Sequence, residues 1–181
     1  MTASQQEIWW VLRAQAGDKE SLSDLLKAVQ EPIYRYILKM VGERAFAEDI
    51  LQEVFLLIYR KLRWLDSPEL FRPWAYRIAT REAFKRLKRE RRWTEQIRDE
   101  TVLNAIPAAS SEMDESINID EVTQMLDRVS PASRAVIILH YLNDMPLAEV
   151  ADVLDINIGT VKSRLAYGLA SLRRVVREQS G

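Results

Sequence analysis

Apolar residues recur along most of the chain at intervals of three and four, which is the period of an amphipathic helix. The strongest run covers residues 45–62, and its members are Ile50, Val54, Leu57, Ile58 and Leu62. Glycine is scarce, and no segment shows the strict alternation of apolar and polar residues that is typical of a half-buried strand. The pattern therefore predicts an all-α protein.

Capping residues, glycine and proline indicate where the first helices begin and end. Ser4 can cap the first helix, and Gly17 with Asp18 should end it and start the next. We place Pro32 in the first turn of a further helix that ends at Gly42. After the run at 45–62, a loop is expected at residues 66–68 and a long, increasingly basic helix from Phe71 to about Arg92.

The periodicity fades between Thr94 and Ile119, where the composition is typical of a flexible linker. We therefore expect two small helical domains, at residues 1–95 and 119–181, joined by a flexible acidic linker at 96–118. The second domain should open with a short helix that carries Ile119, Val122, Met125 and Leu126. Ser130 should cap the next helix, with Pro131 in its first position.

Residues 145–165 have the pattern of two short helices joined by a tight turn. The first helix carries an apolar stripe of Leu147, Val150, Ala151 and Leu154. Asp155 lies where a left-handed backbone is expected, and Gly159 opens the second helix. Val161 and Leu165 should face inward, and the outward residues are Thr160, Lys162, Ser163 and Arg164.

This layout is that of a helix-turn-helix, whose second helix presents its first turns to base edges in the major groove of DNA. An ordinary helical hairpin with a solvated polar face is the alternative, and the matched offsets favour DNA binding. Tyr167 and three arginines continue the second helix; Arg173, Arg174 and Arg177 can contact phosphate or simply complement the C-terminal end of the helix.

Charge is nearly balanced over the 181 residues, with a formal net charge of −1, but it is unevenly distributed. Basic residues dominate residues 77–98. All the charged residues in 99–121 are acidic, and they are Asp99, Glu100, Glu112, Asp114, Glu115, Asp120 and Glu121. The neutral sum therefore hides a basic block next to an acidic one.

The basic block continues a segment with two aromatic residues, Trp74 and Tyr76. A row of cations can neutralise phosphates, and exposed aromatic rings can stack on unpaired bases. The row consists of Arg77, Arg81, Lys85, Lys88 and Arg89. A solvated basic face with its aromatic rings in the core is the alternative, and we favour nucleic-acid binding.

The helix at 45–62 also gathers Glu48, Asp49, Gln52 and Glu53 on one side. This acidic face could dock on a partner with basic residues. From periodicity alone, a solvated helix face is the favoured interpretation.

Taken together, these elements resemble a bacterial RNA polymerase sigma factor of the extracytoplasmic-function (ECF) group, within the sigma-70 family. The resemblance covers nearly the whole chain. It is carried by residues 47–55 (Ala-Glu-Asp-Ile-Leu-Gln-Glu-Val-Phe), residues 74–79 (Trp-Ala-Tyr-Arg-Ile-Ala), the basic run to Arg92, and residues 159–165 (Gly-Thr-Val-Lys-Ser-Arg-Leu).

The resemblance implies that the first domain is sigma domain two and the last is sigma domain four, without the family's middle domain and N-terminal inhibitory region. Asp49, Gln52, Glu53 and Phe55 match the helix that docks on the clamp helices of the polymerase β′ subunit. The loop at 63–73 and the helix from Trp74 resemble the part that captures unstacked bases of the minus-ten element and aids DNA melting.

The second domain resembles the reader of the minus-thirty-five element, with Thr160, Lys162, Ser163, Arg164, Tyr167 and Arg173 as its candidate DNA contacts. The implied partners are core RNA polymerase, at its β′ clamp helices and β flap, promoter DNA, and an anti-sigma factor. In similar proteins the linker runs towards the RNA exit path, where an acidic stretch suits a mimic of RNA.

The sequence departs from the family's pattern in three places, which involve four residues. Thr80 and Arg81 stand where many relatives have Arg-Asn, Lys85 stands where an Asp is common, and Asp155 replaces a frequent Gly. The first two departures lie in the part that resembles the minus-ten reader. The third indicates a slightly strained turn.

Three other functions are compatible with parts of the sequence. A pure adaptor that binds a partner through the helix at 47–62 is one of them, but it leaves both basic elements unexplained. A stand-alone helix-turn-helix regulator would bind duplex DNA unaided, and the acidic face with the basic helix favours a sigma factor instead. An enzyme is not expected, because His140 is the only histidine and neither a phosphate loop nor metal-ligand spacing occurs; no cofactor and no metal are expected. The absence of cysteine, signal peptide and membrane span favours the cytoplasm, with no insertion into the membrane.

Overall fold

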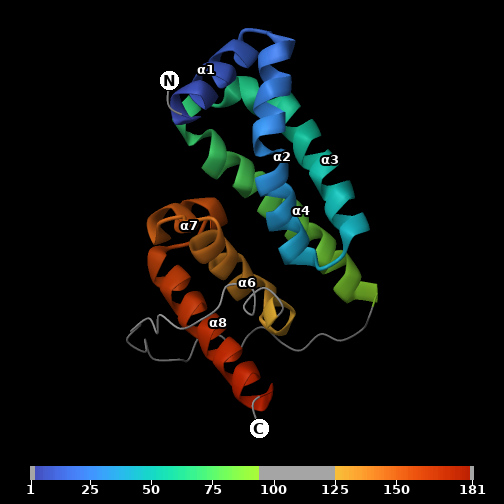
Figure 1. The fold of residues 1–181 in the computed structure, drawn as a ribbon, viewed down its shortest axis with the longest axis vertical. Coiled ribbons are helices and arrows are strands. Elements are labelled where there is room, and N and C mark those ends of the chain that lie inside the picture. The colour runs from blue at the N-terminus through green and yellow to red at the C-terminus, as the bar shows by residue number, and fades with distance from the viewer. Residues whose placement is uncertain (1–2, 94–124, 180–181) are drawn as a thin grey trace. The chain divides into compact units, whose positions relative to one another are not determined.

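The computed structural model describes residues 3–93 and 125–179, and every regular element in these residues is helical. The chain divides into two compact units, Met1–Arg86 and Leu87–Gly181. Figure 1 shows the elements of both units. The all-α prediction is confirmed for the described residues. The acidic linker and most of the short helix predicted at 119–126 lie outside them, so the predicted domain boundaries remain a prediction.

The N-terminal unit is built from α1 (Ala3–Gln15), α2 (Lys19–Val41), α3 (Arg44–Lys61) and α4 (Phe71–Trp93), which runs past the division between the units. Two single 3-10 turns, η1 (Leu62–Trp64) and η2 (Pro68–Leu70), connect α3 to α4. Helix α2 packs against both α1 and α3. The side chains that fill the core include Leu25, Ile33, Ile37, Val54, Ile58 and Phe71.

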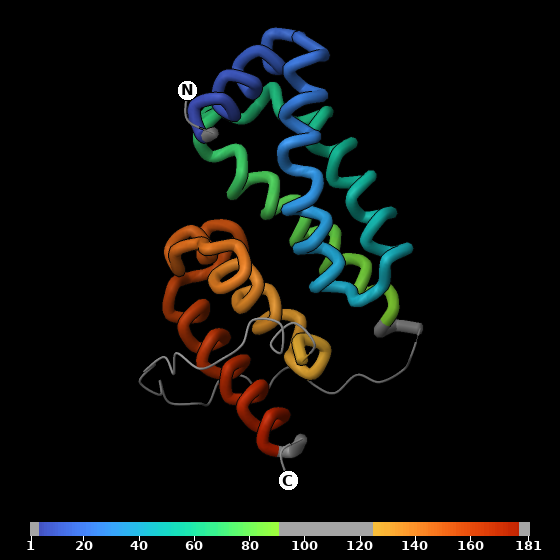
Figure 2. The backbone as a smooth tube through the Cα atoms, in the orientation of Figure 1, coloured from blue at the N-terminus to red at the C-terminus, as the bar shows by residue number. Residues whose placement is uncertain are grey.

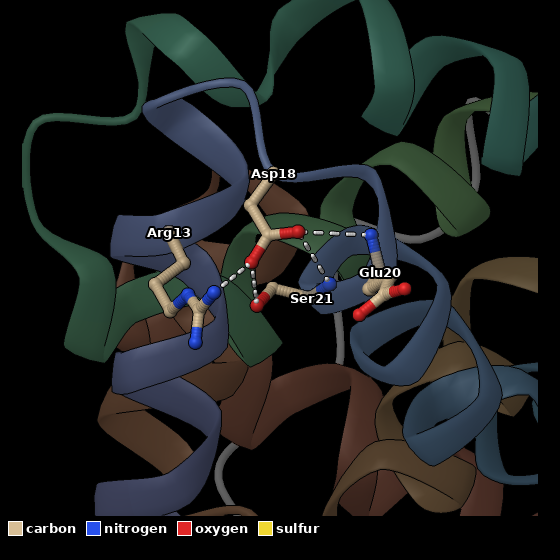
Figure 3. A network of polar contacts seen from close by, with 4 residues as sticks. All are labelled: Arg13, Asp18, Glu20 and Ser21. Atoms are coloured by element: carbon tan, nitrogen blue, oxygen red, sulfur yellow. Dashed lines mark hydrogen bonds and ion pairs between the residues drawn. The ribbon is translucent and has the colours of Figure 1, made fainter.

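Asp18 confirms the junction predicted between the first two helices. Gly17 has a left-handed φ of 97°, and Asp18 caps α2 by accepting hydrogen bonds from the amides of Glu20 and Ser21. Its carboxylate also accepts from the Ser21 hydroxyl at 2.8 Å and pairs with Arg13 at 2.6 Å (Figure 3). The Ser21 hydroxyl, with the two amides and the Arg13 charge, holds the pKa of Asp18 below its ordinary value.

The position predicted for Pro32 is wrong. It lies inside α2, which continues over 23 residues from Lys19 to Val41 rather than starting again at Pro32 (Figure 2). A proline in a helix interior loses one backbone hydrogen bond, which normally ends or kinks the helix. Here Val29 and Ile33 on either side are buried, and so are Tyr36 and Ile37 one turn later. We attribute the unbroken helix to this packing. The predicted end at Gly42 is confirmed, with a left-handed φ of 77°.

The C-terminal unit contains η4 (Leu126–Arg128), α6 (Pro131–Ile137), a π-helical turn η5 (Ile138–Leu142), α7 (Leu147–Leu154) and α8 (Ile158–Gln179). The predicted cap is confirmed, because the Ser130 hydroxyl accepts from the Ser133 amide at 3.4 Å. Helices α6 and α8 cross closely at Gly168, where an added Cβ would lie 2.7 Å from Ile137 Cδ1. A larger residue at position 168 would therefore require the Ile137 side chain to shift.

None of the helices in residues 3–93 and 125–179 combines the length and the apolar character needed to cross a bilayer. The same residues contain no group of three or more metal-ligating His, Cys, Asp or Glu side chains.

Candidate nucleic-acid interface

The turn between α7 and α8 has the geometry of a helix-turn-helix. Asp155 adopts φ 57° and ψ 47°, which confirms the left-handed backbone predicted there. The amide of Ile156 donates to the Ala151 carbonyl at 3.1 Å and closes the end of α7. Val161 and Leu165 are buried, as predicted for the inner face of α8, and Ala151 is 8% exposed.

Asn157 caps the second helix of this turn, a role that was not predicted from the sequence. Its side-chain oxygen accepts from the Thr160 amide at 2.8 Å and from the Thr160 hydroxyl at 3.0 Å, so it caps the start of α8. A Cβ at Gly159 would lie 3.2 Å from the same oxygen, which favours glycine beside the cap. An Asn three residues before a Thr at a helix start is a recognisable capping pattern, so the sequence did contain this signal.

The outward residues of α8 differ in exposure. Lys162 and Ser163 are exposed, whereas Thr160, Arg164 and Tyr167 are half-buried. The Ser163 hydroxyl donates to the Gly159 carbonyl at 3.0 Å. Further along, Arg173 is exposed and lies close enough to Tyr141 for its charge to act on the phenol, although burial raises the pKa of Tyr141 overall. A cationic face therefore follows the first turns of this helix.

On α3, the acidic face predicted from the sequence is exposed at Glu48, Asp49, Gln52 and Glu53. Phe55 is only half-buried, and two other large apolar side chains on the same helix are more exposed. Leu56 is 47% and Tyr59 is 65% exposed. They follow Gln52 at helical spacings of four and seven, so they extend the acidic face with apolar area. The sequence analysis assigned no role to them.

On α4, the predicted basic row is largely outward. Arg81, Lys85, Lys88 and Arg89 are exposed, and Arg77 is half-buried. Lys85 pairs with Glu82 at 3.0 Å, so the row is partly balanced by an acid of its own helix. Arg86, which was not among the predicted contacts, instead places its guanidinium 3.5 Å from the centre of the Phe46 ring.

The prediction that Tyr76 is an exposed base-stacking residue is wrong. Its side chain is 5% exposed and packs edge-on against Tyr36 of α2, with ring centres 5.4 Å apart. Trp74 is half-buried and lies against Phe71, with ring centres 6.1 Å apart. Since both faces of a long helix carry aromatic residues, periodicity did not separate the core face from the outer one.

The exposed aromatic residue of this region is Trp64, in the η1 turn that precedes α4. Its side chain is 61% exposed, and the Arg63 guanidinium lies 4.0 Å from the centre of its ring. Stacking on Trp64 and charge attraction to Arg63 are therefore available side by side. The sequence analysis expected base capture from the loop at 63–73 but did not single out Trp64.

The family comparisons match both halves of this arrangement. The Sigma-70 region 2 family model matches residues 25–93, and the Sigma-70, region 4 model matches residues 119–172. The chain belongs to the sigma-70 family, in its extracytoplasmic-function group. The α3 face and the α4 row of this sigma factor lie within the region 2 match, and the helix-turn-helix lies within the region 4 match.

Full-length relatives agree with the family match. The sigma factor is 28% identical to the ECF RNA polymerase sigma factor SigW of Bacillus subtilis, with 93% of this chain and 95% of SigW covered. It is 26% identical to the RNA polymerase sigma factor NccH of Alcaligenes xylosoxydans, with 91% of each chain covered.

Among solved structures, CnrH in complex with the cytosolic domain of CnrY matches with a TM-score of 0.69 at 19% identity, covering 96% of this chain and 98% of that one. RpoE of Bartonella quintana, in complex with the anti-sigma factor NepR, matches with a TM-score of 0.66 at 18% identity, covering 86% and 96%. These two similarities show that the sigma factor shares their fold.

Proposed function

We propose that this sigma factor binds core RNA polymerase, directs it to promoters through their minus-ten and minus-thirty-five elements, and helps to open the DNA. The observation that carries the proposal is that one chain holds two separate cationic faces, on α4 and α8, together with the acidic face of α3. A regulator that only binds duplex DNA does not require the acidic face of α3. A factor that brings polymerase to a promoter requires that face for docking and both cationic faces for DNA.

We assign polymerase docking to Asp49, Gln52 and Glu53, whose exposed polar groups would meet basic residues of the β′ clamp helices. Complementary charges raise the rate and specificity of such an encounter. The exposed Leu56 and Tyr59 extend the contact with apolar area, and Phe55 contributes less because it is partly inside the unit. From the resemblance, we also propose that the region 4 unit contacts the β flap of the polymerase.

The minus-thirty-five element is assigned to the N-terminal turns of α8. Lys162, Ser163 and Arg164 are the candidate base or phosphate contacts, and Thr160 is positioned by Asn157. Tyr167 and Arg173 follow on the same helix and would contact the flanking backbone. Phosphate contacts position such a helix in the groove, and base contacts determine its specificity.

The minus-ten element is assigned to η1 and α4. Trp64 would stack on an unpaired base beside Arg63, and Arg81, Lys85, Lys88 and Arg89 would neutralise phosphates farther along the strand. Extruding a base costs a few kcal/mol, and contacts that form only with the open strand offset that cost. Trp74 and Arg77 line the same helix but are half-buried, so we expect smaller effects from them.

We further propose that the protein acts in the cytoplasm, with its polymerase, and is restrained by an anti-sigma factor. The second point is supported by the fold shared with CnrH and RpoE, whose structures contain the cytosolic domain of CnrY and the anti-sigma factor NepR.

The decisive experiment is run-off transcription from a pool of genomic promoters with bacterial core polymerase, with and without this protein. Defined transcript starts that need the protein would support the proposal and supply both promoter elements. Gln52→Ala should weaken core binding about tenfold, which corresponds to about 1.4 kcal/mol. Gln30→Ala, at an exposed glutamine of α2, is the matched control and should leave binding unchanged. No initiation, together with tight duplex binding by the protein alone, would leave a stand-alone regulator instead.

A further inference from the structure

Helix α1 is tied at two places to the segment that connects α3 to α4. At the end of α1, Gln15 Nε2 donates to the carbonyl of Leu62 at 2.9 Å and to that of Leu65 at 2.7 Å. Nearer its start, Glu7 accepts a hydrogen bond from Arg72 Nε at 2.8 Å. The two ties therefore hold both ends of the segment from Leu62 to Arg72.

Gln15 suits this task because a carboxamide nitrogen has two hydrogens and can serve two carbonyls at once. The Leu62 carbonyl also accepts from the Leu65 amide at 3.0 Å, which closes the η1 turn. Trp64 lies between these two carbonyls. Gln15 thus holds the backbone on both sides of the exposed indole.

The second tie is anchored inside the unit. The Glu7 side chain is 11% exposed, whereas its partner Arg72 is 49% exposed. One turn after Glu7, Val11 is fully buried, and α1 packs against both η1 and η2. A carboxylate that is this well shielded from water is costly to leave unpaired, so we expect the Glu7–Arg72 contact to be persistent.

We propose that α1 is the frame that keeps the 62–72 segment in the shape that captures an unpaired base, with Gln15 and Glu7 as positioning residues that do not touch DNA. A loop that is already ordered loses less conformational freedom when the strand binds. Helix α1 precedes residue 25, where the region 2 match begins, so this frame is a feature of the chain beyond that match. The inference rests on the role proposed above for Trp64.

The test uses holoenzyme assembled from full-length variants. The probe is a fluorescent single strand that carries the non-template minus-ten sequence of a promoter recovered by run-off transcription. Gln15→Met, which keeps the side-chain length but removes both donors, should weaken strand binding about tenfold, the effect expected from losing about two neutral hydrogen bonds. Affinity for core polymerase and for a duplex with only the minus-thirty-five element should stay within about twofold. Gln30→Met is the matched control.

A double variant separates positioning from a general loss of structure. If Gln15 acts through Trp64, Gln15→Met should weaken strand binding little further in a Trp64→Ala background. Unchanged strand binding by Gln15→Met would overturn the frame while leaving the proposed function intact, as would full additivity with Trp64→Ala. If wild-type holoenzyme itself fails to bind the strand, the proposed function fails instead.

If Gln15→Met folds poorly, the contact between Glu7 and Arg72 provides a second test of the frame. Glu7→Gln keeps an oxygen that can accept from Arg72, and Glu7→Met does not. We expect Glu7→Gln to bind the strand nearly as wild type and Glu7→Met to bind it several-fold more weakly. In the free protein, amide exchange at residues 63–70 should be faster in Glu7→Met than in Glu7→Gln. Equal strand affinity and equal exchange in the two variants would contradict the frame.

Discussion

The Tyr36 hydroxyl on α2 donates to Thr80 Oγ1 on α4 at 2.7 Å, and Thr80 in turn donates to the Tyr76 carbonyl at 2.7 Å. Both side chains are buried, with Tyr36 1% and Thr80 3% exposed. Thr80 stands where many relatives are expected to carry arginine. The hydrogen bond gives this departure a physical meaning, because a small hydroxyl satisfies a buried tyrosine that a long cation would not reach without burying its charge.

Removing either end of this contact should therefore have unequal effects. Thr80→Val leaves the Tyr36 hydroxyl buried without its partner, and it should lower the free energy of unfolding by about 1–3 kcal/mol. Tyr36→Phe removes the hydroxyl but leaves Thr80 bonded to the Tyr76 carbonyl, so about 1 kcal/mol is expected. Urea unfolding of both variants measures the difference. Thr80→Ser, which keeps a hydroxyl, is the control, and a Tyr36→Phe effect larger than that of Thr80→Val would contradict this account.

Gly168→Ala should destabilise the C-terminal unit. The added Cβ would lie 2.7 Å from Cδ1 of the buried Ile137, so that side chain would have to shift within the core, at a cost of about 1–3 kcal/mol. Ile137→Val removes the atom that clashes. Part of the lost stability should therefore return in the double variant, measured by urea unfolding, even though Ile137→Val alone is mildly destabilising. Strictly additive losses would show that the close approach is not the cause.

The Asp18 cap should make stability depend on pH in a defined direction. Its pKa is lower in the folded protein, chiefly through the Ser21 hydroxyl, so the ionised carboxylate stabilises the fold. That stabilisation is present above the unfolded pKa of about 4 and is lost as the pH falls through the folded value. The stability gap between wild type and Asp18→Ala should therefore be larger at pH 7 than at pH 3. A gap that is independent of pH would exclude the carboxylate charge as its source.

Lys162→Ala should reduce promoter affinity through the minus-thirty-five contact. If its ammonium pairs with a phosphate, the slope of log affinity against log salt should fall in magnitude by about 1. Holoenzyme binding to a promoter duplex at several salt concentrations gives that slope. Lys19→Ala, at an exposed lysine of α2, is the matched control and should leave it unchanged. An unchanged slope with weaker binding would point to a base contact instead.

Features that depend on neighbours along the chain followed from the sequence alone. The left-handed turn at Asp155, the helix start at Asp18, the cap at Ser130 and the helix end at Gly42 were all predicted, and the structure confirms them. Each rests on the backbone preferences and hydrogen bonds of a few adjacent residues, which are already present in the local sequence. The inner face of α8 also followed from the sequence, because its apolar residues form a single stripe and only that side of the helix can face the core.

Features that depend on distant residues were decided by the tertiary structure. Pro32 stays inside a helix because buried residues around it pack against the rest of the unit. Tyr76 is buried because its ring packs against Tyr36 of another helix, while Thr80 in the next turn donates to its carbonyl. Trp64 is 61% exposed, whereas Phe71 and Tyr76 after it are buried in the core and Trp74 is half-buried. Gln15 donates to carbonyls 47 and 50 residues further along the chain, and the residues next to Gln15 do not predict such hydrogen bonds. Periodicity indicates which residues share a face, but only the packed chain determines what each face meets.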